Sequence, residues 1–219
     1  MLVKEAKKNT GGLSEPSKMP GYGYGTPARE CRAGSKLRKC EGSVCSTCYA
    51  LKGRYTFSNV QNAQQIRFNL VREPKNRKTW VESMVFLINR HYQLSDAKEF
   101  RWFDSGDLQG IWQLELIVEV CRATPKVKHW MPTREYKDIR DYIKKYGSFP
   151  KNLAVRYSAH WIDKMPTTVI KGVPFSTVST ADDVFPKAHH CPARHQNNEC
   201  GSCRACWDPD VEHVDYHGH

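Results

Sequence analysis

Eight of the nine cysteines form two similar sets near the two ends of the chain. The first set is Cys31, Cys40, Cys45 and Cys48, and the second is Cys191, Cys200, Cys203 and Cys206. Thiolates two residues apart can turn toward one metal centre, and the longer gap after the first cysteine lets a further ligand approach from a loop. The spacing therefore predicts two metal sites, each of which four thiolates could close.

The terminal C-x2-C-x2-C run indicates which metal to expect. Three ligands in such succession suit the corners of a cubane cluster better than the paired knuckles of a zinc ribbon. We expect one or two [4Fe-4S] clusters, with zinc in both sites as the alternative. His189 and His190 adjoin Cys191 and could also ligate. Cys121 lies apart in an apolar stretch and is expected to be a small buried side chain.

Polar residues follow three predicted strands. Asp104, Arg134 and His160 are the candidate catalytic residues, and Ser105, Gly106 and Asp107 are the candidate cofactor-binding residues. If the strands are parallel, these groups converge at one edge of the sheet. The alternatives are an ion pair between Arg134 and Asp104, a helix-capping role for Asp107 at Leu108, and a core or surface role for His160.

The elements that would position these groups alternate between helix and strand. The pattern predicts helices over 58–72, from 79 onward, 108–122 and 135–146, and strands over 99–103, 127–131, 153–157 and within 168–178. Such alternation is typical of parallel βα units. We expect an α/β fold, an incomplete barrel, with cysteine-rich metal-binding segments at both ends. The expected divisions are an irregular basic arm with the first cysteine set (1–57), the core (58–185), and the second set with the tail (186–219), all within one compact domain.

Composition limits location and partners. The chain has no apolar stretch of membrane-spanning length and no signal peptide, so we expect a cytoplasmic protein whose thiols stay reduced. The net charge of +11 arises in residues 1–80, which carry sixteen Lys or Arg against five Glu. Such a block could meet nucleic acid, a small anionic molecule or a redox partner. The sequence leaves the oligomeric state open.

The segments CYA, WFDSGDL, MPTRE and CGSCRACW resemble the phage-encoded family called gene product 88 over roughly residues 15 to 209. This resemblance implies a phage gene expressed in a bacterial cytoplasm. More remotely, the chain is similar to radical S-adenosylmethionine enzymes with an auxiliary-cluster extension. It departs from them in having C-x4-C-x2-C instead of C-x3-C-x2-C, and in lacking their Gly-Gly-Glu motif.

The first cysteine set decides how far that second likeness extends. If Cys31 is a ligand together with Cys40, Cys45 and Cys48, the site is closed, as we expect from the similar second set; if it is not, one iron is open to S-adenosylmethionine. The leading hypothesis is an iron-sulfur protein with redox or electron-transfer chemistry on a radical-enzyme-like scaffold. The alternative is a zinc-stabilised nucleic-acid-binding protein.

Overall fold

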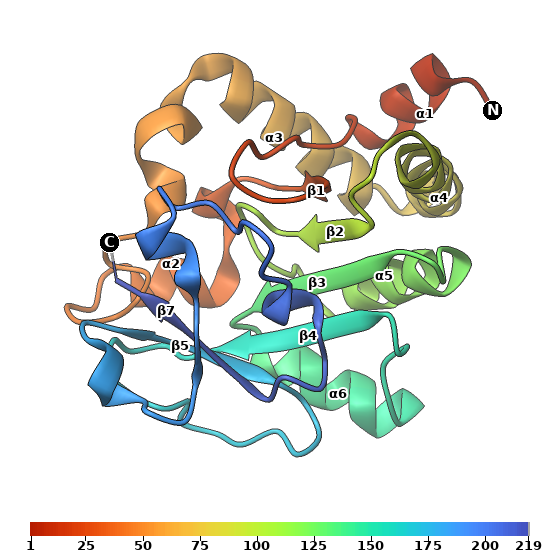
Figure 1. Ribbon diagram of the computed structural model, residues 1–219. Helices are drawn as coiled ribbons and strands as arrows, with labels where there is room; N and C mark the ends of the chain where they lie inside the picture. Colours follow the sequence, from red (N-terminus) through yellow and green to blue (C-terminus); the bar gives the residue numbers. More distant parts are fainter. Residues whose placement is uncertain (219) are drawn as a thin grey trace.

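A computed structural model describes residues 1–218, and its centre is one parallel sheet of seven strands (Figure 1). The spatial order is β1-β2-β3-β4-β5-β7-β6, and every neighbouring pair runs parallel. The strands are β1 (Tyr22–Tyr24), β2 (Glu99–Trp102), β3 (Lys128–Thr133), β4 (Leu153–Ser158), β5 (Phe175–Ser179), β6 (His189–His190) and β7 (His213–His217). The expected α/β class with a parallel sheet is confirmed, and the sheet does not close.

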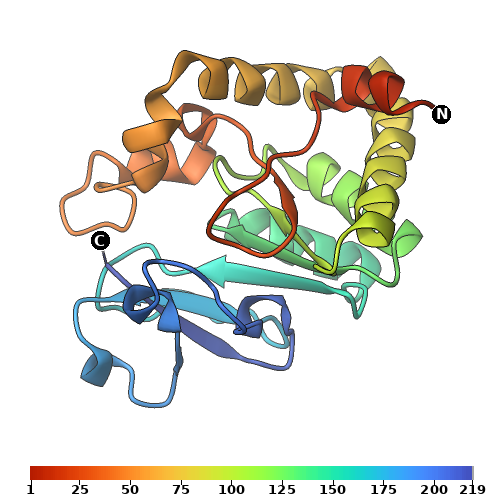
Figure 2. The ribbon, with the colours of Figure 1, turned by 45° about the horizontal axis from the view of Figure 1, so that its top comes forward.

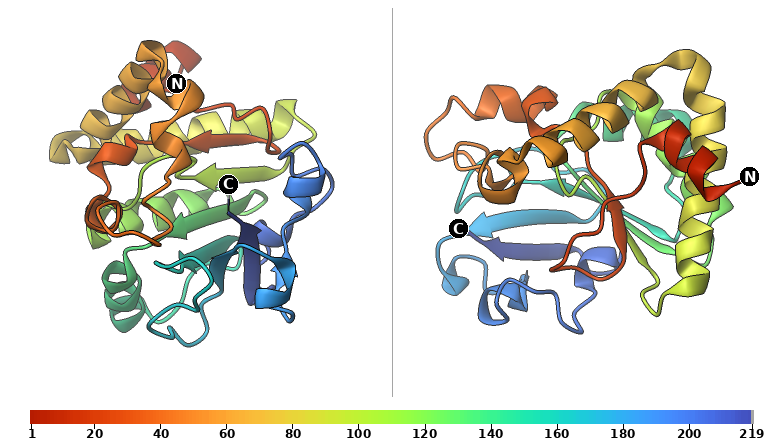
Figure 3. Two further views of the ribbon diagram at one scale, coloured as in Figure 1. Left: turned by 90° about the vertical axis from the view of Figure 1, so that its left-hand side faces the viewer. Right: turned by 90° about the horizontal axis from the view of Figure 1, so that it is seen from above.

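Six α-helices within residues 1–218 flank this sheet. They are α1 (Val3–Thr10), α2 (Arg32–Leu37), α3 (Ser58–Arg72), α4 (Arg77–Leu94), α5 (Ile111–Ala123) and α6 (Tyr136–Tyr146). Short 3-10 helices are η1 (Ala28–Glu30), η2 (Tyr49–Leu51), η3 (Gly53–Thr56), η4 (Pro74–Asn76), η5 (Asp182–Val184), η6 (Pro192–His195) and η7 (Ala205–Trp207). Figure 3 shows α5 and α6 on one side of the strands and the C-terminal segment, drawn in blue, on the other.

The main core fills the space between helices and sheet. In β2, Phe100 and Trp102 alternate with Glu99 and Arg101, so the aromatic pair faces the helices. Trp80 of α4 is fully buried there, and its indole N–H donates a 3.0 Å hydrogen bond to the Tyr24 hydroxyl. All six residues of β4 are buried, as expected for a parallel strand covered on both faces.

The second face is covered by the chain after β5. Trp130 of β3 packs edge-on against Trp207 of η7 with 5.1 Å between ring centroids. The Trp207 indole N–H donates to the carbonyl of Phe100 at 3.0 Å. This small core includes Cys206 and Val214, so the segment with the second cysteine set is part of the packed structure.

The N-terminal arm differs from the expectation of an irregular segment. Its first residues form α1, and Tyr22–Tyr24 adds a strand to the edge of the sheet beside β2. A three-residue strand is too short to produce a periodic pattern, and the Tyr24 side chain is fixed by distant partners, since its hydroxyl donates to carbonyls of Thr10 and Arg67. The local sequence therefore shows neither the strand nor the distant partners of Tyr24.

Several boundaries also shift. The predicted helix from 79 begins at Arg77, and the one predicted over 108–122 begins at Ile111, after Gly110. The β-prone stretch 168–178 contributes only the strand Phe175–Ser179, because Gly172 and Pro174 interrupt it. Strands β6 and β7, which the pattern did not predict, complete the sheet. In the described residues, none of the helices combines the length and the apolar character needed to cross a membrane.

Candidate functional site

The first cysteine set lies at the carboxyl ends of the strands. Figure 2 shows the loop around residue 45, in orange, on the side to which the β4 arrow points. The loop is held there by the segment that follows β4: Val44 N–H donates to the His160 carbonyl at 2.9 Å, and Ile162 N–H donates to the Gly42 carbonyl at 3.1 Å. The strand-end loops and the first cysteine set therefore share one edge of the sheet.

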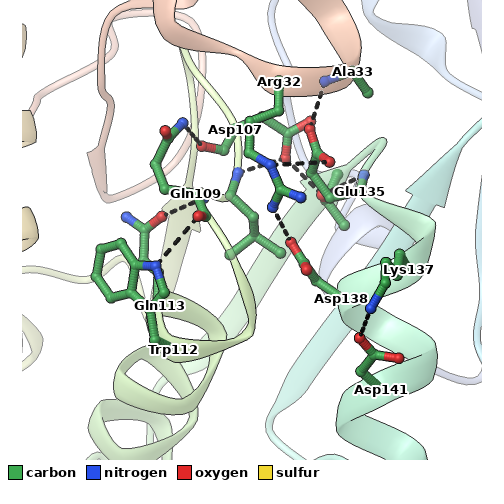
Figure 4. Close-up of polar contacts among 12 residues, drawn as sticks. Arg32, Ala33, Asp107, Gln109, Trp112, Gln113, Glu135, Lys137, Asp138 and Asp141 are labelled. Atoms are coloured by element: carbon green, nitrogen blue, oxygen red, sulfur yellow. Dashed lines mark hydrogen bonds and ion pairs between the residues drawn. The ribbon is translucent and has the colours of Figure 1, made fainter.

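Helix α2, which directly follows Cys31, is docked on the start of α6. The backbone N–H of Ala33 donates a 2.7 Å hydrogen bond to Glu135, and Arg32 forms a 2.7 Å ion pair with Asp138 (Figure 4). Burial raises the pKa of Glu135 and of Asp138, although Arg32 acts to lower both. Glu135 serves as a cap for the exposed amide groups of α2, and this contact fixes the position of Cys31.

Three thiols of the first set lie near one another. Burial raises the pKa of the Cys31 thiol, and the neighbouring Asp107, Cys48 and Cys45 raise it further. Burial also raises the pKa of Cys45, with Arg134 acting in the opposite direction. At Gly34, a Cβ would lie 3.0 Å from Cys31 Cβ, which is a tight contact, and 3.5 Å from Cys45 Sγ, which is an ordinary one, so both cysteine side chains lie beside this glycine.

Cys40 lies differently from these three. It is the exposed member of the set, and its sulfur is 3.8 Å from the carbonyl oxygen of Lys36. The short loop from Cys40 to Cys45 contains Gly42, which adopts φ 75°. The sequence pattern, which treats Cys40, Cys45 and Cys48 as the compact trio, does not reveal this arrangement, because the helix between Cys31 and Cys40 brings Cys31 back toward Cys45.

The four thiols of the second set also lie near one another. Burial raises the pKa of Cys191, Cys200 and Cys206, and the pKa of each is raised further by other members of the set. For Cys206 the pKa rises to about 12, although a hydrogen bond from Tyr216 acts in the opposite direction. The Cys206 sulfur lies 3.1 Å from the Tyr216 hydroxyl, and the Cys203 sulfur lies 3.3 Å from Nε2 of His189.

Arg156 of β4 positions this second set. Its side chain is fully buried, and its terminal nitrogens donate to four backbone carbonyls, those of Phe175, Ala205, Asp208 and Glu212. Two of these carbonyls lie on either side of Cys206 in the chain. The sequence analysis missed Arg156; the signal that could have found it is a lone charged residue inside the strand LAVRYS, where charge is costly unless hydrogen-bonded.

Among the strand-end residues, Asp107 is fully engaged. Its carboxylate accepts hydrogen bonds from the Thr133 hydroxyl, from Arg134 N–H at 2.9 Å and from Leu108 N–H at 2.8 Å. Burial raises its pKa despite these bonds. The expectation that Asp107 caps a helix at Leu108 is wrong, because α5 begins three residues later; the side chain links the loop after β2 to the end of β3 instead.

Gly106 and Ser105 lie against the N-terminal arm. Gly106 adopts φ 85°, and a Cβ there would lie 2.0 Å from the Thr26 hydroxyl, so only glycine fits. Thr26 N–H donates to the Ser105 carbonyl at 2.9 Å. The group that approaches the Gly106 backbone closely is thus Thr26 of the N-terminal arm. The Ser105 hydroxyl is buried and has no hydrogen-bond partner within residues 1–218. A cofactor-binding role for these residues stays a prediction.

The polar contacts of Asp104 are made with the N-terminal arm and with two tyrosines. Its carboxylate accepts a 3.1 Å hydrogen bond from Ser14, and its carbonyl accepts hydrogen bonds from Tyr49 at 2.7 Å and Tyr55 at 3.3 Å. The alternative of an Asp104–Arg134 ion pair is not observed among the ion pairs of residues 1–218. Asp104 is therefore held by Ser14 of the arm and by the two tyrosines that follow Cys48.

Arg134 and His160 lie together, next to the first cysteine set. Arg134 Nε donates to the Ala159 carbonyl at 3.4 Å, and Nε2 of His160 lies 3.5 Å from the Arg134 carbonyl. The His160 ring stacks on Tyr136 with 4.5 Å between centroids. Burial lowers the pKa of His160, which favours the neutral ring near pH 7. Of the predicted catalytic trio, the structure brings together Arg134 and His160, and not Asp104.

Cys121 is fully buried in α5, and burial raises the pKa of its thiol. It belongs to the main core, as the sequence predicts.

A cavity of about 500 Å³ lies elsewhere, beside the first residues of β5, and is lined mainly by apolar side chains such as Ile170 and Phe175. In the part of the chain that the structure describes, no group of three or more His, Cys, Asp or Glu side chains is arranged to hold a metal ion, so the two metal-binding segments expected from the cysteine spacing stay a prediction.

Comparison with known proteins identifies a family. Neither a curated protein nor a solved structure matches the chain. The sequence model of gene product 88 matches residues 1–209, which is nearly the whole chain. The match includes both cysteine sets and all the strand-end residues described above. The chain therefore belongs to the gene product 88 family.

Proposed function

We propose that this protein binds iron-sulfur clusters through its two cysteine sets and performs one-electron redox chemistry next to the Arg134 and His160 side chains. The observation that carries the proposal is the gathering of thiols: Cys31, Cys45 and Cys48 at the carboxyl ends of the strands, and all four of Cys191, Cys200, Cys203 and Cys206 on the second face of the sheet. A cluster held by these thiolates supplies an acceptor and donor of single electrons.

The thiols suit such a group in number and in chemistry, and binding requires that they move closer together, because within residues 1–218 they do not form a ready metal site. Burial and neighbouring thiols raise the pKa of Cys31 and Cys206, so neither ionises readily on its own. A bound iron-sulfur core adds positive charge, which reverses this balance and deprotonates the ligands. Gly34 supports the assignment, because Cys31 Cβ and Cys45 Sγ lie 3.0 Å and 3.5 Å from the position that a Cβ there would take, which places both cysteine side chains beside this glycine.

The first set supports an open site more than a closed one. With Cys40 exposed, three thiols remain as the inner group, and a cubane held by three ligands has one position free. Arg134 is the cation beside this group, and its terminal nitrogens make no hydrogen bond or ion pair within residues 1–218. A guanidinium fork binds carboxylates in two-point contact. We propose that Arg134 holds the carboxylate group of a small ligand at this position, with S-adenosylmethionine as the candidate that the radical-enzyme likeness suggests.

The competing proposal is a zinc-stabilised protein that contacts nucleic acid through its basic N-terminal residues. Its support is the excess of sixteen Lys or Arg over five Glu in residues 1–80. Part of that charge serves the fold, since Arg32 pairs with Asp138 and Arg67 donates to the Gly12 carbonyl. We therefore favour the redox proposal, and we propose a reducing cytoplasm as the location.

The test is the visible spectrum of anaerobically purified protein together with iron, sulfide and zinc analysis. The redox proposal requires charge-transfer bands and equal amounts of iron and inorganic sulfide, and a colourless protein with zinc would exclude it. Electron paramagnetic resonance of the reduced protein, with and without S-adenosylmethionine, then tests the open position. A change in one of two cluster signals supports the open site, and no change in either supports closure.

A further inference from the structure

We propose that Arg101 couples the two cysteine sets, acting as one shared positive charge that sets how readily each centre accepts an electron. This inference rests on the proposed function, because it requires a redox centre at each set. Arg101 is a positioning residue in this proposal: it touches neither set of sulfurs by hydrogen bond and acts through Tyr49 on one side and Trp130 on the other.

Arg101 lies on the face of β2 opposite Phe100 and Trp102, between the two sets. Its terminal nitrogens donate to the Tyr49 hydroxyl at 3.0 Å and contact the Met19 sulfur at 2.8 Å. The guanidinium carbon lies 4.5 Å from the centroid of the Trp130 ring. Its Nε is buried and has no hydrogen-bond partner in residues 1–218. Contacts on several sides hold the charge in one place.

The contact toward the first set runs through Tyr49. This residue directly follows Cys48, and its hydroxyl both accepts from Arg101 and donates to the Asp104 carbonyl at 2.7 Å. The aromatic ring is therefore fixed between the cation and the cysteine. We expect a change in the charge at residue 101 to act on the first cysteine set through the Tyr49 side chain.

The contacts toward the second set run through Trp130 and Tyr216. Trp130, under the guanidinium, stacks on Tyr216 with 6.4 Å between centroids, and the Tyr216 hydroxyl lies 3.1 Å from the Cys206 sulfur. A continuous series of contacts thus runs from Cys206 to Tyr49, with Arg101 at its middle.

The charge of Arg101 is available to both sets. None of the ion pairs in residues 1–218 joins it to a carboxylate. Reduction adds one electron to a centre and makes it more negative, so a fixed nearby cation stabilises the reduced form. In the experiment dithionite is oxidised and supplies that electron, and no bond is made or broken in the protein.

The experiment is a dithionite titration of the full-length, anaerobically purified protein, followed by electron paramagnetic resonance. Cys31→Ser and Cys203→Ser assign the two cluster signals. Arg101→Gln should lower both midpoint potentials, each by about a tenfold change in the reduction equilibrium, which is about 59 mV for one electron. Arg204→Gln is the matched control: Arg204 donates to the Cys203 carbonyl at 2.9 Å and pairs with Glu99 at 3.1 Å, and none of its hydrogen bonds or ion pairs within residues 1–218 joins it to Tyr49, so only the second signal should shift.

Two more variants separate charge from packing. Arg101→Lys keeps the charge and should leave both potentials within a threefold change in the reduction equilibrium, whereas a shift as large as that of Arg101→Gln would overturn the proposal. Tyr49→Phe should lower only the first potential, and it tests the link even if Arg101→Gln loses its iron. Unchanged potentials in Tyr49→Phe, or a shift of one signal only in Arg101→Gln, would also overturn it. A wild-type protein without iron and sulfide would instead defeat the proposed function.

Discussion

The backbone N–H of Arg134 donates a 2.9 Å hydrogen bond to the carboxylate of Asp107, and this bond joins the ends of two adjacent strands. Asp107 follows β2 and Arg134 follows β3. The Thr133 hydroxyl donates to the same carboxylate, so the end of β3 is bound at two points. Arg134 is held in place through its backbone and through the hydrogen bond of its Nε to the Ala159 carbonyl, and its terminal guanidinium nitrogens make no hydrogen bond or ion pair within residues 1–218.

The burial of Asp107 predicts a pH dependence of stability. Its pKa is raised above the ordinary value near 3.8, and the pKa values of Glu135 and Asp138 are raised in the same direction. A carboxyl whose pKa is higher in the folded state stabilises that state when protonated, and this contribution is lost as pH rises through the folded-state pKa. The free energy of unfolding should therefore gain a downward slope above about pH 4.

Urea denaturation between about pH 4 and pH 7 checks this slope. Asp107→Asn should make the fall in unfolding free energy shallower, because one of the three carboxyls no longer titrates. Asp96→Asn, at an exposed position before β2, should keep the wild-type slope. A wild-type slope in Asp107→Asn would mean that the hydrogen bonds to the carboxylate outweigh its burial.

The unequal placement of the first four cysteines predicts unequal effects of their removal. Cys31→Ser should lower the iron content and the visible absorbance, since Cys31 belongs to the inner trio. Cys40→Ser should leave both unchanged, because the Cys40 side chain is exposed. Iron and sulfide per chain are the measurement. Equal losses in the two variants would favour the closed four-thiolate site expected from sequence.

Cys203 and Cys121 form a second contrasting pair. Cys203→Ala should remove the iron of one cluster and lower the thermal stability, because metal binding at this set stabilises the C-terminal segment. Cys121→Ala should keep the spectrum and lose only roughly 1 kcal/mol of stability, as expected for a small change in the core. A folded Cys121→Ala protein without colour, or an unchanged Cys203→Ala protein, would contradict these assignments.

The parts of the fold that sequence predicted are those with local patterns. The helix 58–72 appears as α3, and the alternation from β2 to β4 is confirmed, because apolar periodicity and burial agree there. Strand β1, with Tyr24, and strand β7, with Tyr216, escaped detection. Strand β1 has only three residues, and each of the two strands is defined by its neighbour across the sheet, which a local pattern does not contain.

The candidate site was predictable in its residue types and not in its grouping. Arg134 and His160 do share the carboxyl edge of the sheet, as parallel strands require. The Asp104 carboxylate instead accepts a hydrogen bond from the N-terminal arm, and the Asp107 carboxylate accepts hydrogen bonds from the end of β3. The grouping of Cys31 with Cys45 depends on the docking of α2 on Glu135, a contact between residues about a hundred positions apart. Spacing within a motif carries no information about such contacts.

The buried guanidinium of Arg156 gives the most direct test of how the second cysteine set is held. Its four carbonyl partners lie in three segments: Ala205 and Asp208 flank Cys206, Phe175 begins β5, and Glu212 precedes β7. Burial lowers the pKa of Arg156, which shows that the site itself disfavours charge and that the hydrogen bonds must offset this cost. Removing the side chain leaves several buried carbonyls without a partner.

Arg156→Met should therefore lower the unfolding free energy by about 2 to 4 kcal/mol, since each unsatisfied buried group costs about 1 to 3 kcal/mol and the methionine side chain recovers part of the packing. Arg156→Lys should not restore stability, because a single ammonium does not reproduce the planar fork that reaches both pairs of carbonyls. Urea denaturation provides the measurement, and Arg140→Met on the exposed face of α6 is the control, with a change within about 0.5 kcal/mol. If Arg156 positions Cys206, both Arg156 variants should also hold less iron per folded chain than Arg140→Met. Full iron content and wild-type stability in Arg156→Met would contradict this role. They would show that η7 and its cysteine are held by Trp207 and the apolar contacts alone.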